Sequence, residues 1–301
     1  MDRAALSSGR ARWQAWVVAA RVPTLPAAVA PVLVGTAVAA RTGGVRLLPT
    51  LGALAVALFL QIGTNFANDA FDFLRGADTA HRRGPTRAVQ SGLLSARQML
   101  AGAYACFGLA ALVGTYFVVL RGWPVLVVGL LAIASGLGYT GGPWPIGYRG
   151  LGEVFVFVFF GVVAVAGTAY VQTGGLSLLA AAASVPVGLL VTAILVVNNL
   201  RDIDTDAAAG KRTLAVRVGD PATRALYVFC LAGAAVTPAV LRVGGVTGMW
   251  FWLPWLAAPM MAVLIRAALR EHNAAALNRL LRRTAQFHLL FGVLFAASLR
   301  W

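Results

Sequence analysis

Long apolar stretches alternate with short polar segments along most of the chain. An α-helix of about 20 apolar residues crosses the hydrocarbon core of a bilayer, so windows of this length predict transmembrane helices. The pattern therefore predicts an all-α integral membrane protein with about nine transmembrane helices. The windows cover approximately residues 22–40, 50–68, 98–120, 123–141, 152–172, 177–199, 223–241, 248–266 and 285–300.

The first apolar window differs from a secretory signal peptide. It contains Pro23, Pro26 and Pro31, and no clear small-residue cleavage site follows it. We therefore expect this segment to be retained as a transmembrane helix. The predicted organisation is a cytoplasmic N-terminal segment at residues 1–21, followed by a single transmembrane domain at residues 22–301.

Basic residues are distributed unevenly between the two sides of the predicted bundle. The formal net charge is +15, with 25 Lys and Arg residues against 10 Asp and Glu residues. This bias predicts a cytoplasmic N-terminus, because inner segments are enriched in Lys and Arg. It also accounts for the net charge without a nucleic-acid partner, which would need basic residues clustered on a polar fold. In this topology the outer segments hold only Arg41, Arg46, Arg121, Arg242 and Arg300.

Six of the ten acidic residues lie in two short stretches. These are NFANDAFDFLRGAD at residues 65–78 and NNLRDIDTD at residues 198–206. Each stretch follows a predicted transmembrane helix, and the predicted topology places both on the cytoplasmic side. Carboxylates at membrane depth are costly, so they persist mainly where they function. The two stretches are therefore the first candidates for a functional site.

The spacing within each stretch places carboxylates on one helical face. Asp69 and Asp72 are three positions apart and Asp202 and Asp206 are four apart, so each pair shares a face if its helix continues. Two carboxylate clusters brought together repel each other unless a cation lies between them. Mg²⁺ prefers oxygen ligands from carboxylates, water and phosphates. The spacing predicts a magnesium site, to which Asn68 can add an amide oxygen.

Basic residues follow both acidic stretches. Lys211 is the only lysine in the chain and precedes Arg212, a pair suited to phosphate binding. The first stretch is followed by Arg82, Arg83 and Arg87. Acidic groups for a metal and basic groups for phosphate on one membrane face predict a magnesium–diphosphate site. The alternative is that these charges are solvated loop residues, whose surface ion pairs contribute little.

Both stretches belong to longer segments that resemble a known family. NDAFDFLRGAD and RDIDTDAAAGKRTLAVRVG resemble the two aspartate-rich motifs of the UbiA superfamily of intramembrane aromatic prenyltransferases. The segments at residues 21–37, 84–95 and 139–153 resemble its 1,4-dihydroxy-2-naphthoate polyprenyltransferase branch. The resemblance is close over residues 21–220 and rests on helix count beyond them.

This resemblance implies a nine-helix bundle whose metal site caps a lateral cavity open to lipid. It implies Mg²⁺-dependent transfer of a polyprenyl group from polyprenyl diphosphate to 1,4-dihydroxy-2-naphthoate. Loss of the acceptor carboxylate would then give demethylmenaquinol, in menaquinone biosynthesis. The implied location is the cell membrane, with the active site facing the cytoplasm.

The resemblance also implies residue roles. Asp69, Asp72, Asp202, Asp206 and Lys211 are the expected catalytic residues. The implied Mg²⁺ ligands are Asn68, Asp69, Asp72, Asp202 and Asp206. The implied diphosphate-binding residues are Lys211, Arg212, Arg75 and Arg87. The implied supporting residues are Asn65, Asn198, Asn199, Asp78 and Asp204.

The polar segment at residues 139–153, YTGGPWPIGYRGLGE, supplies candidates for the acceptor site. Tyr139, Tyr148 and Arg149 are expected to orient the acceptor, Arg149 by pairing with its carboxylate. Glu153 is expected to assist deprotonation of a naphthol hydroxyl. An equally weighted alternative is that the aromatic residues form an interfacial belt and the Gly-Pro run a turn.

Two other functions are compatible with parts of the pattern. A prenyltransferase acting on another aromatic acceptor, such as 4-hydroxybenzoate, would need the same aspartates, because these recognise only the diphosphate. A cation-coupled transporter would usually place ionisable residues near the midplane on broken helices, whereas here they follow the apolar windows. The predicted partners are polyprenyl diphosphate, the aromatic acceptor and the lipid bilayer, without nucleic acid.

Overall fold

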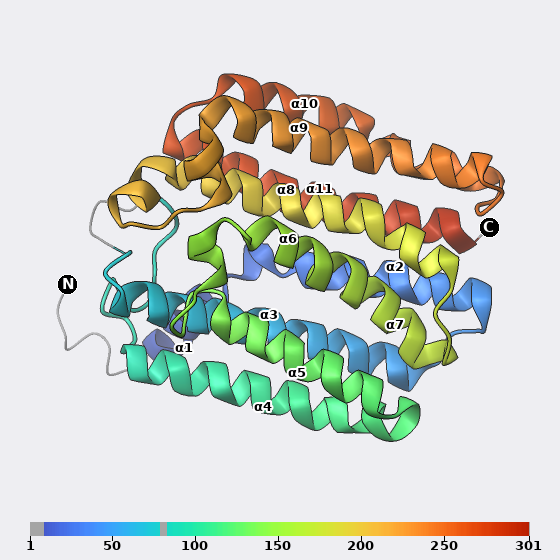
Figure 1. Ribbon diagram of the computed structural model, residues 1–301, viewed down its shortest axis with the longest axis horizontal. Helices are drawn as coiled ribbons and strands as arrows, with labels where there is room; N and C mark the ends of the chain where they lie inside the picture. Colours follow the sequence, from blue (N-terminus) through green and yellow to red (C-terminus); the bar gives the residue numbers. More distant parts are fainter. Residues whose placement is uncertain (1–8, 79–82, 301) are drawn as a thin grey trace.

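Helices make up the regular structure of the protein (Figure 1). The computed structural model describes residues 9–78 and 83–300, and within these ranges it has no strand. The prediction of an all-α fold is confirmed. The helices are α1 Gly9–Ala20, α2 Pro26–Thr42, α3 Leu47–Leu74, α4 Ala96–Arg121, α5 Trp123–Gly138, α6 Gly152–Val156, α7 Ala164–Thr173, α8 Leu178–Ala208, α9 Leu214–Val243, α10 Ala258–Arg270 and α11 Ala274–Arg300. Shorter 3₁₀ or π segments are η2 Val22–Thr24, η3 Ile146–Arg149, η4 Phe157–Val163 and η5 Met249–Ala257.

Six helical segments in the described ranges are long and apolar enough to cross a membrane. They are α3, α4, α6 to α7, α8, α9 and η5 to α10. The end of α1 and α2 together form a seventh candidate, bent by 52°. Helix α5 has 16 residues, and α11 carries the polar Gln286 and His288 within its apolar stretch. The chain is thus a multi-pass membrane protein, while nine spans and the cytoplasmic N-terminus stay predictions.

Helix α8 is the most buried of these segments, with 72% of its most apolar window inside the bundle. It shares one hydrophobic core with α2, α9 and α11, which includes Val191, Leu231 and Phe287. A smaller core joins α1, α3 and α4. The π segment η4 approaches α8 closely, since a Cβ at Gly161 would lie 2.5 Å from the Cα of Gly188. Small residues of this kind let membrane helices pack backbone to backbone.

An apolar cavity of about 700 Å³ lies among α2, α3, α4, α5 and the α6 to α7 segment. Its lining runs from Thr64 and Tyr139, near the C-termini of α3 and α5, to Leu176, which follows α7. Most of the lining consists of Ala, Val, Leu and Phe side chains. The cavity therefore offers apolar space along the length of the bundle, with one end close to the first aspartate-rich stretch.

Two arginines at the opposite end of the bundle cap helix C-termini. Arg121 donates hydrogen bonds to the carbonyls of Val171 and Gln172, at 3.1 and 2.7 Å. Arg41 donates to the carbonyl of Leu299 at 3.1 Å. The last carbonyls of a helix lack partners within it, and basic side chains can satisfy them. These two predicted outer arginines therefore have structural roles.

Candidate active site

Helices α3 and α8 end in the same hydrogen-bonded motif. Gly76 and Gly210, each just beyond its helix, have φ angles of 72° and 71°. The N–H after each glycine donates to a backbone carbonyl one turn back, that of Asp72 at 2.9 Å and that of Asp206 at 2.8 Å. This is the Schellman arrangement, in which glycine adopts the left-handed conformation at little cost. Asp72 and Asp206 thus occupy equivalent positions at two helix ends.

The carboxylate of Asp72 is buried and has three polar partners. Its Oδ2 accepts a hydrogen bond from Arg87 at 3.0 Å, and its Oδ1 accepts one from the Tyr148 hydroxyl at 2.9 Å. Lys211 Nζ lies 3.8 Å from Oδ1. Burial raises the pKa of Tyr148, and the charge of Asp72 raises it further. The tyrosine therefore remains a neutral hydrogen-bond donor at physiological pH.

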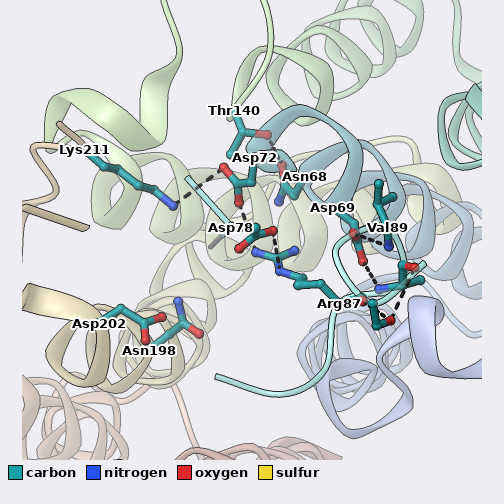
Figure 2. A network of polar contacts seen from close by, with 12 residues as sticks. Asn68, Asp69, Asp72, Asp78, Arg87, Val89, Thr140, Asn198, Asp202 and Lys211 are labelled. Atoms are coloured by element: carbon teal, nitrogen blue, oxygen red, sulfur yellow. Dashed lines mark hydrogen bonds and ion pairs between the residues drawn. The ribbon is translucent and has the colours of Figure 1, made fainter. Parts of the chain in front are cut away.

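Lys211 joins the two aspartate-rich stretches. Its ammonium lies 3.8 Å from Asp72 Oδ1 and 3.8 Å from Asp206 Oδ1. It also lies 5.1 Å from the centre of the Tyr148 ring. Figure 2 shows the side chain extending toward Asp72. One cation therefore sits between a carboxylate of α3 and a carboxylate of α8, as the two clusters require.

Asp69 accepts hydrogen bonds from the segment that follows α3, at residues 88–89. Its Oδ2 accepts a hydrogen bond from the backbone N–H of Ala88 at 3.0 Å, and its Oδ1 accepts one from Val89 at 3.2 Å. In Figure 2 its carboxylate points toward Val89, on the side away from Lys211. These bonds give Asp69 a loop-positioning role, and its metal-binding role stays a prediction. A buried carboxylate satisfied by backbone amides holds a loop in one conformation.

Arg87 lies buried between two carboxylates. It bonds Asp72, and its Nε lies 3.2 Å from Asp78 Oδ2. Arg83, from the same sequence segment, has a different environment. Arg83 pairs with Asp204 at 2.8 Å, and both side chains are largely exposed, while Arg82 lies outside the described residues. Asp78 therefore supports Arg87, whereas Asp204 belongs to a surface ion pair.

Asp202 pairs with a residue that the sequence analysis did not select, Arg201. The Arg201 side chain is fully buried and donates to both oxygens of Asp202, to Oδ1 at 2.8 Å. It also donates to Asn198 Oδ1 at 2.9 Å and to Asn278 Oδ1 at 2.7 Å. Asn278, on α11, donates in turn to the carbonyl of Arg83 at 3.0 Å. This network joins α8, α11 and the segment after α3.

The candidate acceptor residues occupy different environments. Tyr139 lines the apolar cavity. Glu153 is buried, and its Oε1 accepts a hydrogen bond from Asn199 at 2.8 Å. Within the described ranges its buried Oε2 has no hydrogen-bond partner. Arg149 is exposed and stacks on Trp144, with the guanidinium 4.7 Å from the ring centre. Tyr139 and Glu153 thus lie in the interior of the bundle and Arg149 at its surface, and the acceptor roles of all three stay predictions.

Two predicted asparagines connect α3 to neighbouring segments. Asn68 Oδ1 accepts a hydrogen bond from the Thr140 hydroxyl at 2.9 Å. Asn65 donates to the carbonyl of Ala20 at 3.0 Å. Asn65 is therefore a support at the bend between α1 and α2. Asn68 keeps its predicted position beside Asp72, one helical turn earlier on α3 (Figure 2).

Two further predicted arginines surround Tyr148. Arg75 places its guanidinium 5.5 Å from the Tyr148 ring centre and donates to the carbonyl of Gly142. The backbone N–H of Arg212 donates to the carbonyl of Tyr148 at 3.1 Å, while its side chain is exposed. The segment η3 is thus held between the two aspartate-rich stretches.

The chain matches the UbiA prenyltransferase family over residues 28–292. The chain belongs to the UbiA prenyltransferase family. It is 45% identical over 255 residues to the 1,4-dihydroxy-2-naphthoate octaprenyltransferase of Mycobacterium tuberculosis, covering 84% of each chain. It is 37% identical over 304 residues to the Escherichia coli protein of the same name, covering 96% of each.

The fold of this UbiA prenyltransferase also has solved counterparts. One is a UbiA homolog from Archaeoglobus fulgidus bound to GPP and Mg²⁺, with a TM-score of 0.63. The two chains are 14% identical, and the match covers 93% of this chain and 99% of the other. At this identity the likeness concerns the fold alone.

The carboxylates of Asp72, Asp202 and Asp206 are paired with basic side chains. Across residues 9–78 and 83–300, no three His, Cys, Asp or Glu side chains are arranged to hold a metal ion. The donor chemistry nevertheless fits a hard cation, because carboxylate oxygens of Asp72 and Asp206 already share the Lys211 ammonium. Asp72 and Asp206 would hold such a cation from the ends of α3 and α8.

Proposed function

We propose that this UbiA prenyltransferase transfers a polyprenyl group from a polyprenyl diphosphate to 1,4-dihydroxy-2-naphthoate, with loss of the acceptor carboxylate. The product would be demethylmenaquinol, an intermediate on the way to menaquinone. The similarity to two proteins named for this acceptor, at 45% and 37% identity over most of the chain, carries the proposal. No comparable observation favours 4-hydroxybenzoate, and family membership favours an enzyme over a transporter.

The apolar cavity is the proposed site of the prenyl tail. Its lining is almost entirely apolar, and it reaches Tyr139 at the end nearest the aspartates. An isoprenoid tail in this cavity would place its diphosphate at the polar end, beside Lys211. The same apolar surroundings would exclude water, which would otherwise capture an allylic cation before the acceptor does.

Mg²⁺ is the proposed cofactor, held by Asn68, Asp72, Asp202 and Asp206. Support comes from the oxygen-only donor set and from the fold shared with a UbiA homolog bound to GPP and Mg²⁺. When bound, magnesium would supply positive charge to the departing diphosphate.

The residues of the chain itself would then hold the leaving group. Lys211 is already a cation at the junction of α3 and α8, and its ammonium can bind the diphosphate from there. Arg87 keeps Asp72 in place through a buried ion pair. Arg212, which is exposed and follows Lys211, and Arg75, beside Tyr148, would contact the outer phosphate. Charge-assisted hydrogen bonds of this kind are about twice as strong as neutral ones.

For the acceptor, we propose that Glu153 takes the proton of the attacking naphthol. Its Oε1 is oriented by Asn199, and its Oε2 is buried without a hydrogen-bond partner in the described part of the chain. A carboxylate oxygen with an unused lone pair can accept a proton from a substrate hydroxyl within hydrogen-bond reach. Tyr139 lies on the cavity wall and would orient the ring.

We also propose that the aspartate-rich end faces the cytoplasm, across the cell membrane. The positive-inside distribution of Lys and Arg supports this orientation. Accessibility of single cysteines to an impermeant thiol reagent in intact cells tests it, after Cys106 and Cys230 are replaced by alanine. Labelling at residue 46 without labelling at residue 149 is the expected pattern, and the reverse would overturn the orientation.

The function is tested with purified protein in detergent. Farnesyl diphosphate is incubated with 1,4-dihydroxy-2-naphthoate or with 4-hydroxybenzoate, each with Mg²⁺ or with EDTA, and products are identified by mass spectrometry. We expect a decarboxylated prenyl-naphthoquinol that forms only with Mg²⁺. Product from 4-hydroxybenzoate alone would overturn the proposed acceptor but agree with prenyl transfer as the reaction. Product formation in EDTA would overturn the proposed requirement for Mg²⁺.

A further inference from the structure

A second cleft lies between α10 and the first turns of α11, apart from the residues described so far. It has a volume of about 70 Å³, and its lining includes the apolar Leu264 and Leu280 together with Arg279, Arg283 and Glu271. One water molecule needs roughly 10–15 Å³, so the space admits a larger group. The cleft thus combines apolar walls with basic side chains.

Arginine is concentrated around this cleft. Five arginine side chains of α10 and α11 are exposed, and none of the five has an ion pair or hydrogen bond in the structure of residues 9–78 and 83–300. Pairs at i, i+4 repel each other on a helix surface unless an anion lies between them. The buried arginines of the bundle, in contrast, are paired with carboxylates. The group consists of Arg266, Arg270, Arg279, Arg282 and Arg283.

The cleft lies at the aspartate-rich end of the bundle. Asn278, in the same turns of α11, contacts the backbone of Arg83. In Figure 1 the junction between α10 and α11 lies at the edge opposite the C-terminus. The orientation proposed above puts the lipid head groups of the cytoplasmic leaflet at this level. Basic pockets between helices at that level suit anionic lipid head groups.

We propose that the cleft between α10 and α11 binds an anionic phospholipid, with its phosphate on Arg279 and Arg283 and its glycerol end against the exposed side chain of Val263. A free phosphate would use only the basic part of this lining, whereas a phospholipid uses both parts. Glu271 lies in the same lining and opposes an anion there. Removing the charge of Arg283 should therefore weaken lipid binding, and removing the charge of Glu271 should strengthen it.

Three variants of the full-length protein test the proposal. Arg283→Gln removes a basic group from the cleft lining, and Glu271→Gln removes the acidic group. Arg282→Gln is the matched control, because Arg282 is exposed on the adjacent position of α11 and does not line the cleft. Melting temperatures in lipid-free detergent and prenyl transfer in detergent show whether each variant is folded.

Binding is measured by native mass spectrometry with phosphatidylglycerol, with phosphatidylcholine as the neutral lipid and inorganic phosphate as the free anion. We expect Arg283→Gln to weaken phosphatidylglycerol binding about fivefold, Arg282→Gln to leave it within about twofold, and Glu271→Gln to strengthen it. Equal losses in the two arginine variants would indicate a diffuse basic surface and overturn the cleft. Equal binding of phosphatidylcholine, or phosphate competing at millimolar concentration, would overturn an anionic lipid as the ligand.

Discussion

At Asp72 one buried carboxylate meets an arginine, a tyrosine hydroxyl and a lysine. Three donors on a single acidic side chain fix its position before any substrate arrives. Such preorganisation lets charge develop in a transition state without rearrangement of the surroundings. Asp204, by comparison, forms one ion pair whose two side chains are largely exposed. The two residues therefore offer a matched comparison of the same change.

Asp72→Asn should lower kcat/KM for prenyl transfer by at least about 100-fold, because removing one electrostatic group from an active site typically costs that much. Asp204→Asn should change it by no more than about twofold, because exposed ion pairs contribute little. Steady-state kinetics with saturating acceptor measure both, and melting temperatures confirm folding. Equal effects of the two substitutions would contradict the role proposed for Asp72.

At the scale of elements, the Asn278 side chain of α11 forms hydrogen bonds with residues of the site. Asn278 accepts from Arg201 and donates to the carbonyl of Arg83, so it connects three separate segments. Loss of its acceptor would leave a guanidinium nitrogen of the buried Arg201 without a partner. The C-terminal helix, which contributes no predicted ligand, thus helps to position Asp202.

Asn278→Ala should lower both the melting temperature and kcat/KM, by an amount corresponding to about 1–3 kcal/mol of lost hydrogen bonding. Asn278→Asp keeps an acceptor for Arg201 and loses only the bond to Arg83, so it should retain more of both quantities. Thermal unfolding in detergent and steady-state kinetics provide the two measurements. A wild-type melting temperature and kcat/KM for Asn278→Ala would show that α11 acts independently of the site.

The helices could be predicted from apolar windows, but not their full lengths. The windows predicted ends near residues 68 and 199, whereas α3 continues to Leu74 and α8 to Ala208. Hydropathy falls at the first polar residues, while helical hydrogen bonding continues to the glycine that ends each helix. Five of the six aspartates in the two stretches consequently lie on the helices, and only Asp78 follows α3.

The site was predictable where its chemistry is local in sequence. The two aspartate-rich stretches and Lys211 are contiguous motifs. Arg201 adjoins Asp202, so its pairing could have been suspected, but Asn278 lies 77 positions from Arg201 and only the packing of α11 brings them together. The stacking of Arg149 on Trp144 could not be predicted for a related reason, because it depends on how η3 folds.

At the scale of the whole molecule, the long cavity sets the space for the substrate tail. Gly167 of α7 lines it, and a Cβ there would have no other atom within 4 Å. A larger side chain at this position would therefore enter the cavity without a clash. Gly108 of α4 also has open space around it and does not line the cavity.

Gly167→Leu should reduce the preference for long over short prenyl diphosphates by about tenfold or more, since filling a pocket discriminates by a few methylene groups. Gly108→Leu should leave the preference unchanged, and both variants gain similar helix propensity. Competition between geranyl and geranylgeranyl diphosphate, followed by product ratios, measures the effect. An unchanged ratio for Gly167→Leu would place the tail elsewhere.

The bridging position of Lys211 has a practical consequence. Because the chain contains no other lysine, an amine-selective reagent has one side-chain target in the entire protein, and that target touches both aspartate-rich stretches. With 16% of its side chain exposed, Lys211 is partly accessible to solvent. The rate at which such a reagent modifies Lys211 would therefore report whether a ligand is bound at the junction of α3 and α8.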